Sequence, residues 1–178
     1  MDISTFVELS HGEWRSMRSG HSLAFQYFEE VLSEVKIQCL DIDDEAVSKL
    51  ANSVKPPEGE LIAPFNMEWE AESDWEPDDP TAVSSGQCIL IPYQIDPSHG
   101  QIIRSVGYAE AEQAITDYSF SSDGTLVLRT VYGQSIAEER IWFASDNVRC
   151  RSSVLKTSEG SGILQTSFAS EVRKISKP

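Results

Sequence analysis

The stretch that decides the fold is Ser135–Leu155, which reads SIAEERIWFASDNVRCRSSVL. Polar and apolar residues alternate in both halves, and a polar break at Ser145–Asn147 separates them. Alternation with a period of two is typical of a β-strand with one buried face, and a short polar break between two such runs is typical of a hairpin. We therefore predict paired strands over Ser135–Phe143 and Val148–Leu155.

The same alternation continues in both directions from this hairpin. Breaks rich in Gly, Asp and Ser recur, as at Asp96–Gly100 and Ser122–Gly124. The further predicted strands are Glu13–Ser22, Val31–Asp41, Asn66–Trp75, Gln87–Ile95, Gln101–Ala109, Ala114–Ser121, Thr125–Tyr132 and Leu164–Arg173. Because short links make consecutive strands neighbours, the chain should form an antiparallel meander. A sheet of about ten strands avoids exposed edges by closing, so we predict an all-β, up-and-down barrel that can enclose a small ligand.

Two short helices accompany the predicted barrel. Ile3, Phe6 and Val7 share one face of an N-terminal helix, which ends at a His–Gly pair because glycine readily terminates helices. A second helix is predicted near 43–54, where acidic residues begin it and two prolines follow it. As an interruption between strands, this second helix is expected to lie across one end of the barrel.

The chain is strongly acidic, with a formal net charge of −15 over 178 residues. This charge argues against binding to nucleic acid or to an anionic membrane, because both need a basic surface. Acidic residues concentrate at 58–80, a segment without Lys or Arg, whereas basic residues outnumber acidic ones over 129–156. A local basic site in an acidic protein suggests the capture of one anionic ligand.

Length and composition fit a single domain over 1–178. No apolar run approaches the ~20 residues of a membrane helix and no signal peptide pattern is present, so we expect a cytosolic protein, or a stromal one in an algal plastid, without membrane insertion. Cys39, Cys88 and Cys150 are widely separated and are expected to be small packed hydrophobes rather than a disulfide framework or a zinc site. Motifs of the common hydrolases, kinases and dehydrogenases are absent from the sequence.

The segment Met67–Glu76, MEWEAESDWE, has the sharpest alternation in the chain. On a strand, Met67, Trp69 and Trp75 point to one face and the acidic residues point to the other. The large side chains either fill the barrel as core residues, which the residue types alone favour, or form an aromatic wall for a flat conjugated ligand.

Charged residues mark the hairpin of the opening stretch. Arg149, Arg151 and Ser153 share a face of the second strand of the hairpin, and Glu139 lies on the first strand. Facing inward, the arginines would need Glu139 or an anionic ligand as a partner, because an unpaired interior charge is costly. Two guanidiniums at this spacing suit two carboxylates of one molecule. Facing outward, they would form a solvated ion pair, and the spacing alone favours that simpler interpretation.

A third stretch, Trp14–Phe25, reads WRSMRSGHSLAF and shows no catalytic spacing. Arg18 and His21 either reach a ligand or lie on the strand surface, and their residue types favour the surface.

These stretches together, WRSMRSGHSLAF, MEWE and EERIWF followed by RCRSS, resemble the S-type (CpcS/CpeS) phycobiliprotein lyases. The resemblance covers nearly the whole chain, from about Phe6 to Val172. It implies a lipocalin-like or fatty-acid-binding-protein-like barrel that has no cofactor of its own and binds a phycobilin, a linear tetrapyrrole, non-covalently as its substrate. It further implies that the lyase attaches the bilin through a thioether bond to a cysteine of an apo-phycobiliprotein subunit.

The resemblance also implies roles for individual residues. The apolar and aromatic pocket positions carry over to Met67, Trp69 and Trp75, and the polar ones to Glu139, Arg149, Arg151 and Ser153. In the family the arginines hold the bilin propionates and the carboxylate lies near the pyrrole nitrogens, which makes Glu139 the candidate catalytic residue. No metal site is implied.

The MEWE form is similar to the phycoerythrin-associated branch of the family, which favours phycoerythrobilin over phycocyanobilin and phycoerythrin as the acceptor. Two other functions share the same sequence features: a passive lipocalin-like tetrapyrrole carrier, and a phycobilisome assembly chaperone that recognises an antenna subunit. A homodimer is compatible with each of them.

Overall fold

The computed structural model describes residues 1–73, 84–106, 113–159 and 162–175. Its helices are α1 (Ile3–Ser10) and α2 (Glu45–Ala51), and neither is long and apolar enough to cross a membrane. Its strands are β1 (Gly12–Ser22), β2 (Tyr27–Cys39), β3 (Glu60–Leu61), β4 (Phe65–Ser73), β5 (Ser84–Asp96), β6 (His99–Arg104), β7 (Ala114–Phe120), β8 (Leu126–Val131), β9 (Ser135–Ser145), β10 (Val148–Thr157) and β11 (Ile163–Arg173). The predicted strands and helices are all found, and β3 is an addition.

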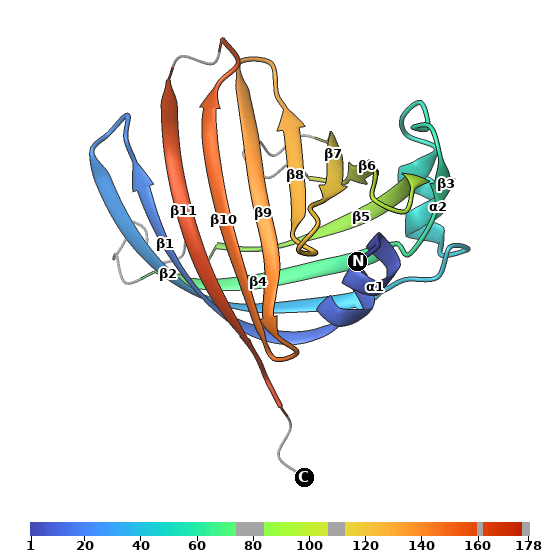
Figure 1. Cartoon of the computed structure of the whole chain (residues 1–178), viewed down its shortest axis with the longest axis horizontal. Helices are drawn as coiled ribbons and strands as arrows, with labels where there is room; N and C mark the ends of the chain where they lie inside the picture. The colour runs from blue at the N-terminus through green and yellow to red at the C-terminus, as the bar shows by residue number, and fades with distance from the viewer. Residues whose placement is uncertain (74–83, 107–112, 160–161, 176–178) are drawn as a thin grey trace.

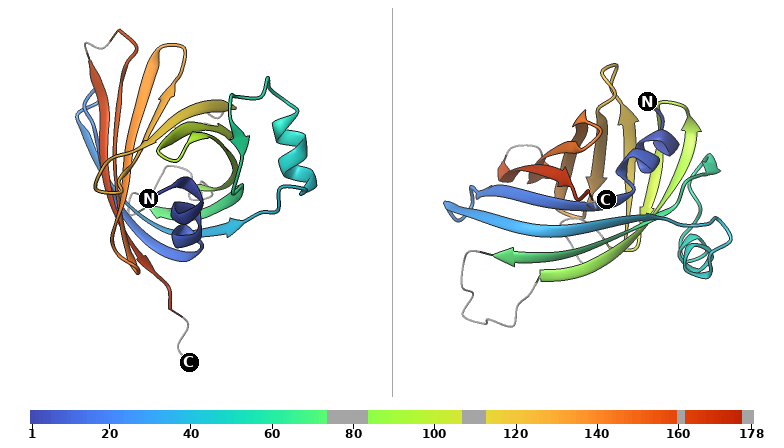
Figure 2. Two further views of the ribbon diagram at one scale, coloured as in Figure 1. Left: turned by 45° about the vertical axis from the view of Figure 1, so that its right-hand side comes forward. Right: turned by 90° about the horizontal axis from the view of Figure 1, so that it is seen from below.

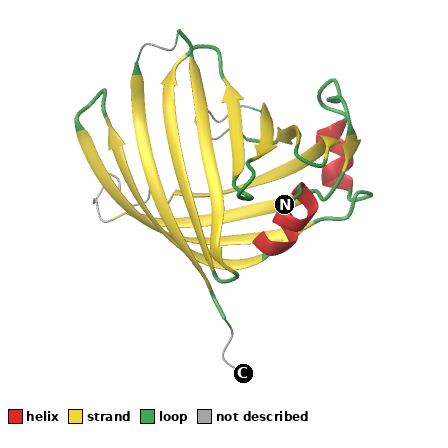
Figure 3. Cartoon of the chain, viewed as in Figure 1, coloured by secondary structure: helices red, strands yellow, loops and turns green. Residues whose placement is uncertain are grey.

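The strands form one antiparallel sheet that closes into a barrel (Figures 1 and 3). Each long strand pairs with the next long strand along the chain, and β1 pairs with β11, so the first and last strands meet. β4 follows β2 directly in the ring, because the short β3 pairs instead with β5 through Leu61 and Tyr93. The predicted all-β, up-and-down barrel is confirmed, and its cause is the short polar links that keep consecutive strands adjacent.

The strand bounds differ in detail from the predicted ones. β2 begins earlier than predicted, because Tyr27 already pairs with Ser22 across the tight turn after β1. β6 ends at Arg104, well before the predicted end of that strand. Trp75, the predicted end of the strand that forms β4, lies outside the described residues.

The predicted N-terminal helix α1 lies inside the rim of the barrel at one end (Figure 2). Asp2 begins it, since its carboxylate accepts a hydrogen bond from the backbone N–H of Thr5 at 2.8 Å. The apolar face of α1, formed by Ile3, Phe6 and Val7, is buried in the main core. The inward side chains of the barrel that complete this core are Trp14, Ile37, Phe65, Cys88, Leu90, Ile102, Tyr118, Leu126, Leu128 and Ile141. This end of the barrel is therefore closed and apolar.

Trp14 on β1 attaches α1 to the barrel. It is fully buried, and its indole N–H donates to the carbonyl of the last residue of α1 at 2.8 Å. The guanidiniums of Arg149 and Arg173 lie over its ring, at 4.8 and 4.3 Å from the centroid. Arg173 also donates to the carbonyl oxygens of Leu9, at 2.6 Å, and of His11. The final carbonyls of α1, which have no partner within the helix, are thus satisfied by two side chains of the barrel.

The position of α2 differs from the prediction. It packs on the outside of the barrel and does not lie across an end (Figure 2). Val47 of α2 is fully buried and forms a second core with Ile91, Tyr93 and Ile103. The reason is that β5 and β6 are apolar on both faces, so their outer face also requires a cover.

Replacement of Arg173 by Met tests its role in holding α1. Met keeps an aliphatic stem over Trp14 but removes the charge and the hydrogen bonds to the helix. We expect R173M to lower the free energy of unfolding by about 1–3 kcal/mol, measured by urea denaturation. The matched control is R15M, because Arg15 is exposed and its contact with Glu34 is 3.8 Å long; this change should cost under about 0.5 kcal/mol. Equal losses in the two variants would contradict the assignment.

Candidate functional site

The hairpin of β9 and β10 carries its charged residues on the inner face of the barrel. In the register of the two strands, Glu139 is opposite Ser153 and Ile141 is opposite Arg151. Ile141 belongs to the main core, while Glu139 and Arg149 are each 1% exposed. The spacing allowed these charged residues to face either the interior or the solvent, and in the structure they face the interior.

Two further charged residues, Arg104 on β6 and Glu171 on β11, join this group. Arg104 donates from Nη1 to Oε1 of Glu139 at 3.1 Å, and Nη1 of Arg151 lies 3.8 Å from the other carboxylate oxygen, Oε2. Arg149 donates from Nε to Oε2 of Glu171 at 2.5 Å. The five side chains form two adjacent ion-pair groups inside the barrel, which we call the charge cluster.

Sequence reasoning missed Arg104 and Glu171, although a signal for both was present. Arg104 occupies the same face of its strand as Ile102, and Glu171 the same face as Ala169, and both apolar neighbours are buried. A charged residue at a core position of a two-residue repeat is a candidate for a buried site.

Burial and neighbouring charge act in opposite directions on the protonation of these residues. Burial works against the ionised form of Glu171, but the positive charges of Arg149 and Arg151 outweigh it and lower the pKa of Glu171. Burial also disfavours charged Arg104, yet the carboxylate of Glu139 raises the pKa of Arg104 above its usual value. For Arg149, burial dominates and lowers the pKa, with Glu171 opposing it. Pairing therefore keeps these charges inside the protein.

The charge cluster has more positive than negative groups. Its three guanidiniums, Arg104, Arg149 and Arg151, face two carboxylates, Glu139 and Glu171. Nη2 of Arg149 and Nε of Arg104 are buried and have no hydrogen-bond partner among the described residues. Because buried donors without acceptors are costly, this arrangement suits a bound anion that brings both acceptors and negative charge.

The barrel is accessible at the end away from α1. Inward-facing side chains there, including Val31, Ser33 and Ser167, are partly exposed, in contrast to the fully buried residues around the helix. Arg151 also retains 19% exposure of its side chain, although its strand neighbour Arg149 retains only 2%. The charge cluster thus lies between a closed apolar end and an open end, and Arg151 is its more accessible arginine.

The structure separates Arg18 from His21. Arg18 points into the open end and pairs with Glu29 at 2.8 Å. His21 lies on the outer face of β1, with its ring 4.8 Å from that of Phe28. Positions three apart on a strand face opposite sides, so only Arg18 can belong to an interior site.

Met67 and Trp69 point into the barrel and pack against the main core. The indole of Trp69 lies over Gly86 of β5, where an added Cβ would be only 2.5 Å from Cζ2 of the ring. The absence of a side chain at Gly86 therefore leaves the space that the Trp69 ring occupies. Trp75, the third member of the predicted aromatic wall, lies outside the described residues.

Ser153 completes the inward set of β10. It is buried, and its hydroxyl is 2.6 Å from the hydroxyl of Ser167 on β11. The two residues are directly paired across the strands, next to the Glu139 position. A polar strip therefore continues from the charge cluster toward the open end.

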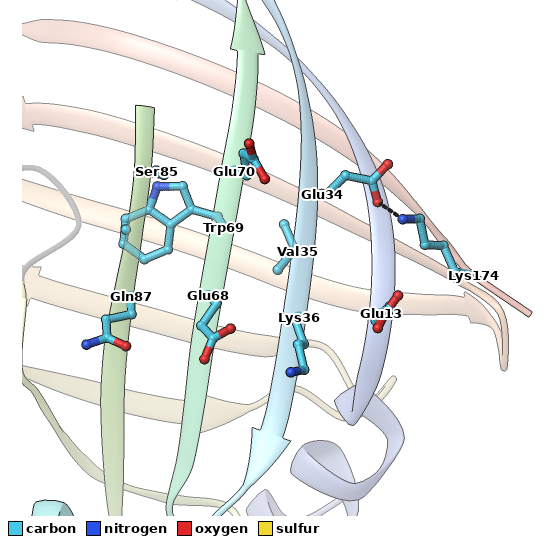
Figure 4. A pocket seen from close by; sticks show the side chains of 11 residues that line it. Glu13, Glu34, Val35, Lys36, Glu68, Trp69, Glu70, Ser85, Gln87 and Lys174 are labelled. Atoms are coloured by element: carbon cyan, nitrogen blue, oxygen red, sulfur yellow. Dashed lines mark ion pairs between the residues drawn. The ribbon is translucent and has the colours of Figure 1, made fainter. Parts of the chain in front are cut away.

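A groove of about 490 Å³ lies over β2, β4 and β5, lined mainly by charged side chains from the outer face (Figure 4). Its acidic residues are Glu13, Glu34, Glu68 and Glu70, and its basic residues are Lys36 and Lys174. Lys174 pairs with Glu34 at 2.5 Å, so part of this charge is neutralised within the groove. These charged side chains point away from the charge cluster. Trp69 and Gly86 also line the groove, so it reaches the indole that packs against the main core.

The three cysteines are free. Cys88 is buried in the main core, as expected for a packed residue, whereas Cys150 is half-buried on the outer face of β10. Cys39 differs, because it is the last residue of β2 and is exposed there.

Comparisons with known proteins agree with this geometry. The family described as "CpeS-like protein" matches residues 2–174. The chain is 46% identical to "Chromophore lyase CpcS/CpeS 3" of Trichodesmium erythraeum, over 97% of this chain and 99% of that one. It is 42% identical to "Putative phycoerythrobilin lyase CpeS" of Microchaete diplosiphon, over 89% and 71%. The solved structure of the S-type phycobiliprotein lyase CPES from Guillardia theta superposes with a TM-score of 0.84 at 35% identity, over 99% and 95% of the two chains.

Replacement of Glu171 by Gln tests the buried pair with Arg149. Because its native pKa lies below the ordinary value of 4.5, Glu171 stabilises the fold above that pH, and this contribution disappears as the pH falls through the native pKa. We expect E171Q to lose about 3–5 kcal/mol at pH 7 and to approach the wild type in acid, measured by urea denaturation from pH 7 to pH 3. E30Q, at an exposed position, is the control. A stability difference that stays constant with pH would refute the pairing.

Proposed function

The chain belongs to the CpeS-like protein family, and we propose that it is a chromophore lyase, which binds a phycobilin and attaches it to a cysteine of a phycobiliprotein subunit. The names of its relatives support a lyase that acts on a bilin chromophore. In this proposal the protein needs no cofactor of its own and works in a cyanobacterial cytosol or a plastid stroma.

The observation that carries the proposal is the excess of guanidinium groups inside the barrel. A bilin is a flat, conjugated molecule with two propionate groups, and carboxylates accept paired hydrogen bonds from arginine. We assign the propionates to Arg149 and Arg151. Arg151 is accessible from the open end, and Nη2 of Arg149 is a buried donor that lacks a hydrogen-bond partner among the described side chains.

We assign Met67 and Trp69 to the wall beside the tetrapyrrole, with Trp75 as its third member, and Ser153 and Arg18 to the polar path toward the open end. The inward orientation of Trp69 over Gly86 supports the wall, because a ring held flat against a strand offers its face to a conjugated ligand. His21, on the outer face, has no part in the proposed binding site.

The proposed reaction is addition of the acceptor thiol across the ethylidene double bond of ring A. The sulfur forms one C–S bond, the electron pair of the double bond moves into the ring, and the ring takes up one proton. The lyase accelerates this step by holding the bilin in one extended shape and in the protonated state that attracts the thiolate. Glu139 hydrogen-bonds the pyrrole nitrogens and balances their positive charge.

We propose phycoerythrobilin as the bilin and phycoerythrin as the acceptor. The MEWE sequence at Met67–Glu70 and the printed name of the Microchaete diplosiphon relative support this choice over phycocyanobilin.

A transfer assay tests the function directly. The purified chain is mixed with phycoerythrobilin and an apo-phycoerythrin subunit, and covalent product is read as zinc-induced fluorescence after a denaturing gel. We expect product at a rate at least about tenfold above the reaction without the chain, and a loss of that gain in E139Q. The variant with Cys39, Cys88 and Cys150 all changed to Ser should transfer normally, because the nucleophile belongs to the acceptor.

The alternatives give different results in the same assay. A passive carrier would bind the bilin without raising the transfer rate. An assembly chaperone would increase folded phycoerythrin in the absence of bilin. A cysteine triple variant that binds bilin but cannot transfer it would rule out the proposed chemistry.

Replacement of Gly86 by Ala tests the aromatic wall. The added methyl group would lie 2.5 Å from the Trp69 ring and must displace it. We expect the Kd for phycoerythrobilin to rise about tenfold, as followed by titration of the absorption spectrum. The matched control is G133A, since a Cβ at Gly133 meets nothing within 4 Å. Unchanged affinity in G86A would remove Trp69 from the binding wall.

A further inference from the structure

Arg104 belongs to the charge cluster and contacts Glu139, but the proposed reaction gives it no role. Only 5% of its side chain is exposed, so it is remote from solvent. Its hydrogen bond to Glu139 at 3.1 Å joins β6 to β9, two strands that are not neighbours in the sheet. The contact therefore crosses the interior of the barrel.

The strands between β6 and β9 leave room for the contact of Arg104 with Glu139. β7 and β8 separate β6 from β9, and their inward residues near Arg104 are small. Ala114 is paired with Arg104, and the hydroxyls of Thr116 and Thr130 bond to each other at 2.7 Å. One of these hydroxyls donates to the other, so the two threonines are held together by their own hydrogen bond.

The two oxygens of Glu139 have different surroundings. Oε1 accepts the hydrogen bond from Arg104, whereas Oε2 lies 3.8 Å from Nη1 of Arg151, beyond normal hydrogen-bond length. Arg104 thus fixes the carboxylate by Oε1, while Oε2 faces the more accessible arginine, Arg151.

We propose that Arg104 is a positioning residue, which anchors Oε1 of Glu139 so that Oε2 accepts from the pyrrole N–H groups of the bilin. Glu139 then serves as a fixed counter-charge for the cationic chromophore and does not donate a proton. The inference rests on the proposed bilin-binding function and adds to it the residue through which Glu139 is oriented.

The test is a double-mutant cycle with R104M, E139Q and R104M/E139Q, using phycoerythrobilin as the probe. We expect R104M to shift the absorption maximum of the bound bilin in the same direction as E139Q and to slow transfer about tenfold. In the double variant, R104M should add less than about a twofold effect to E139Q, because Arg104 acts only through that carboxylate. R104K, which keeps the charge, should recover part of the wild-type spectrum and rate.

A control variant makes the result decisive. T130V breaks the hydroxyl pair beside Arg104 without touching Glu139, so it should lower the melting temperature but leave the bilin spectrum unchanged. If R104M alone does not fold, R104K and the double variant carry the test, since removing both members of a buried pair is better tolerated than removing one.

A wild-type spectrum and rate in R104M, or independent effects that multiply in the double variant, would overturn the role of Arg104. Failure of the wild-type chain to bind phycoerythrobilin would instead overturn the proposed function, and this inference with it.

Discussion

The contact between Arg149 and Trp14 connects the end of the barrel that α1 closes to the charge cluster. On one side, Trp14 and Arg173 complete the carbonyl end of α1 and so close the barrel. On the other side, Arg149 donates to Glu171 within the charge cluster. One guanidinium thus contacts both the closed end and the candidate site. The apolar packing of the helix and the orientation of the buried charges are therefore coupled.

The arrangement of charge inside the barrel is unfavourable for stability alone. Removing several charges from water costs free energy that their mutual attraction only partly recovers, and apolar packing of the same volume is often as stable. Here the cost is limited by pairing within the cluster, but one positive charge remains in excess. That excess is best understood as complementarity to an anionic ligand, which supplies the missing negative charge when it binds.

The two ends of the barrel differ in structure, and so do its inner and outer faces. α1 closes one end, and the other end is accessible, where partly exposed inward residues lead to Arg151. On the outside, α2 covers the apolar face of β5 and β6, and a groove over β2, β4 and β5 carries mainly acidic side chains. The acidic exterior and the basic interior explain how a chain of net charge −15 can hold an anion.

The sequence by itself determined the barrel and which residues share a face of each strand. A two-residue period and short polar turns are local properties, so the strands, their antiparallel order and the shared face of Arg149, Arg151 and Ser153 could be read without a structure. The family resemblance then supplied the ligand. What only the tertiary structure decided was which face is inside and which residues meet across the barrel. Arg104 and Glu139 are far apart in sequence and three strands apart in the sheet, and only closure of the barrel brings them to 3.1 Å. The same closure left α2 outside and decided that Arg18 faces inward and His21 outward, because burial of a face depends on the packing of the whole sheet and not on any one strand.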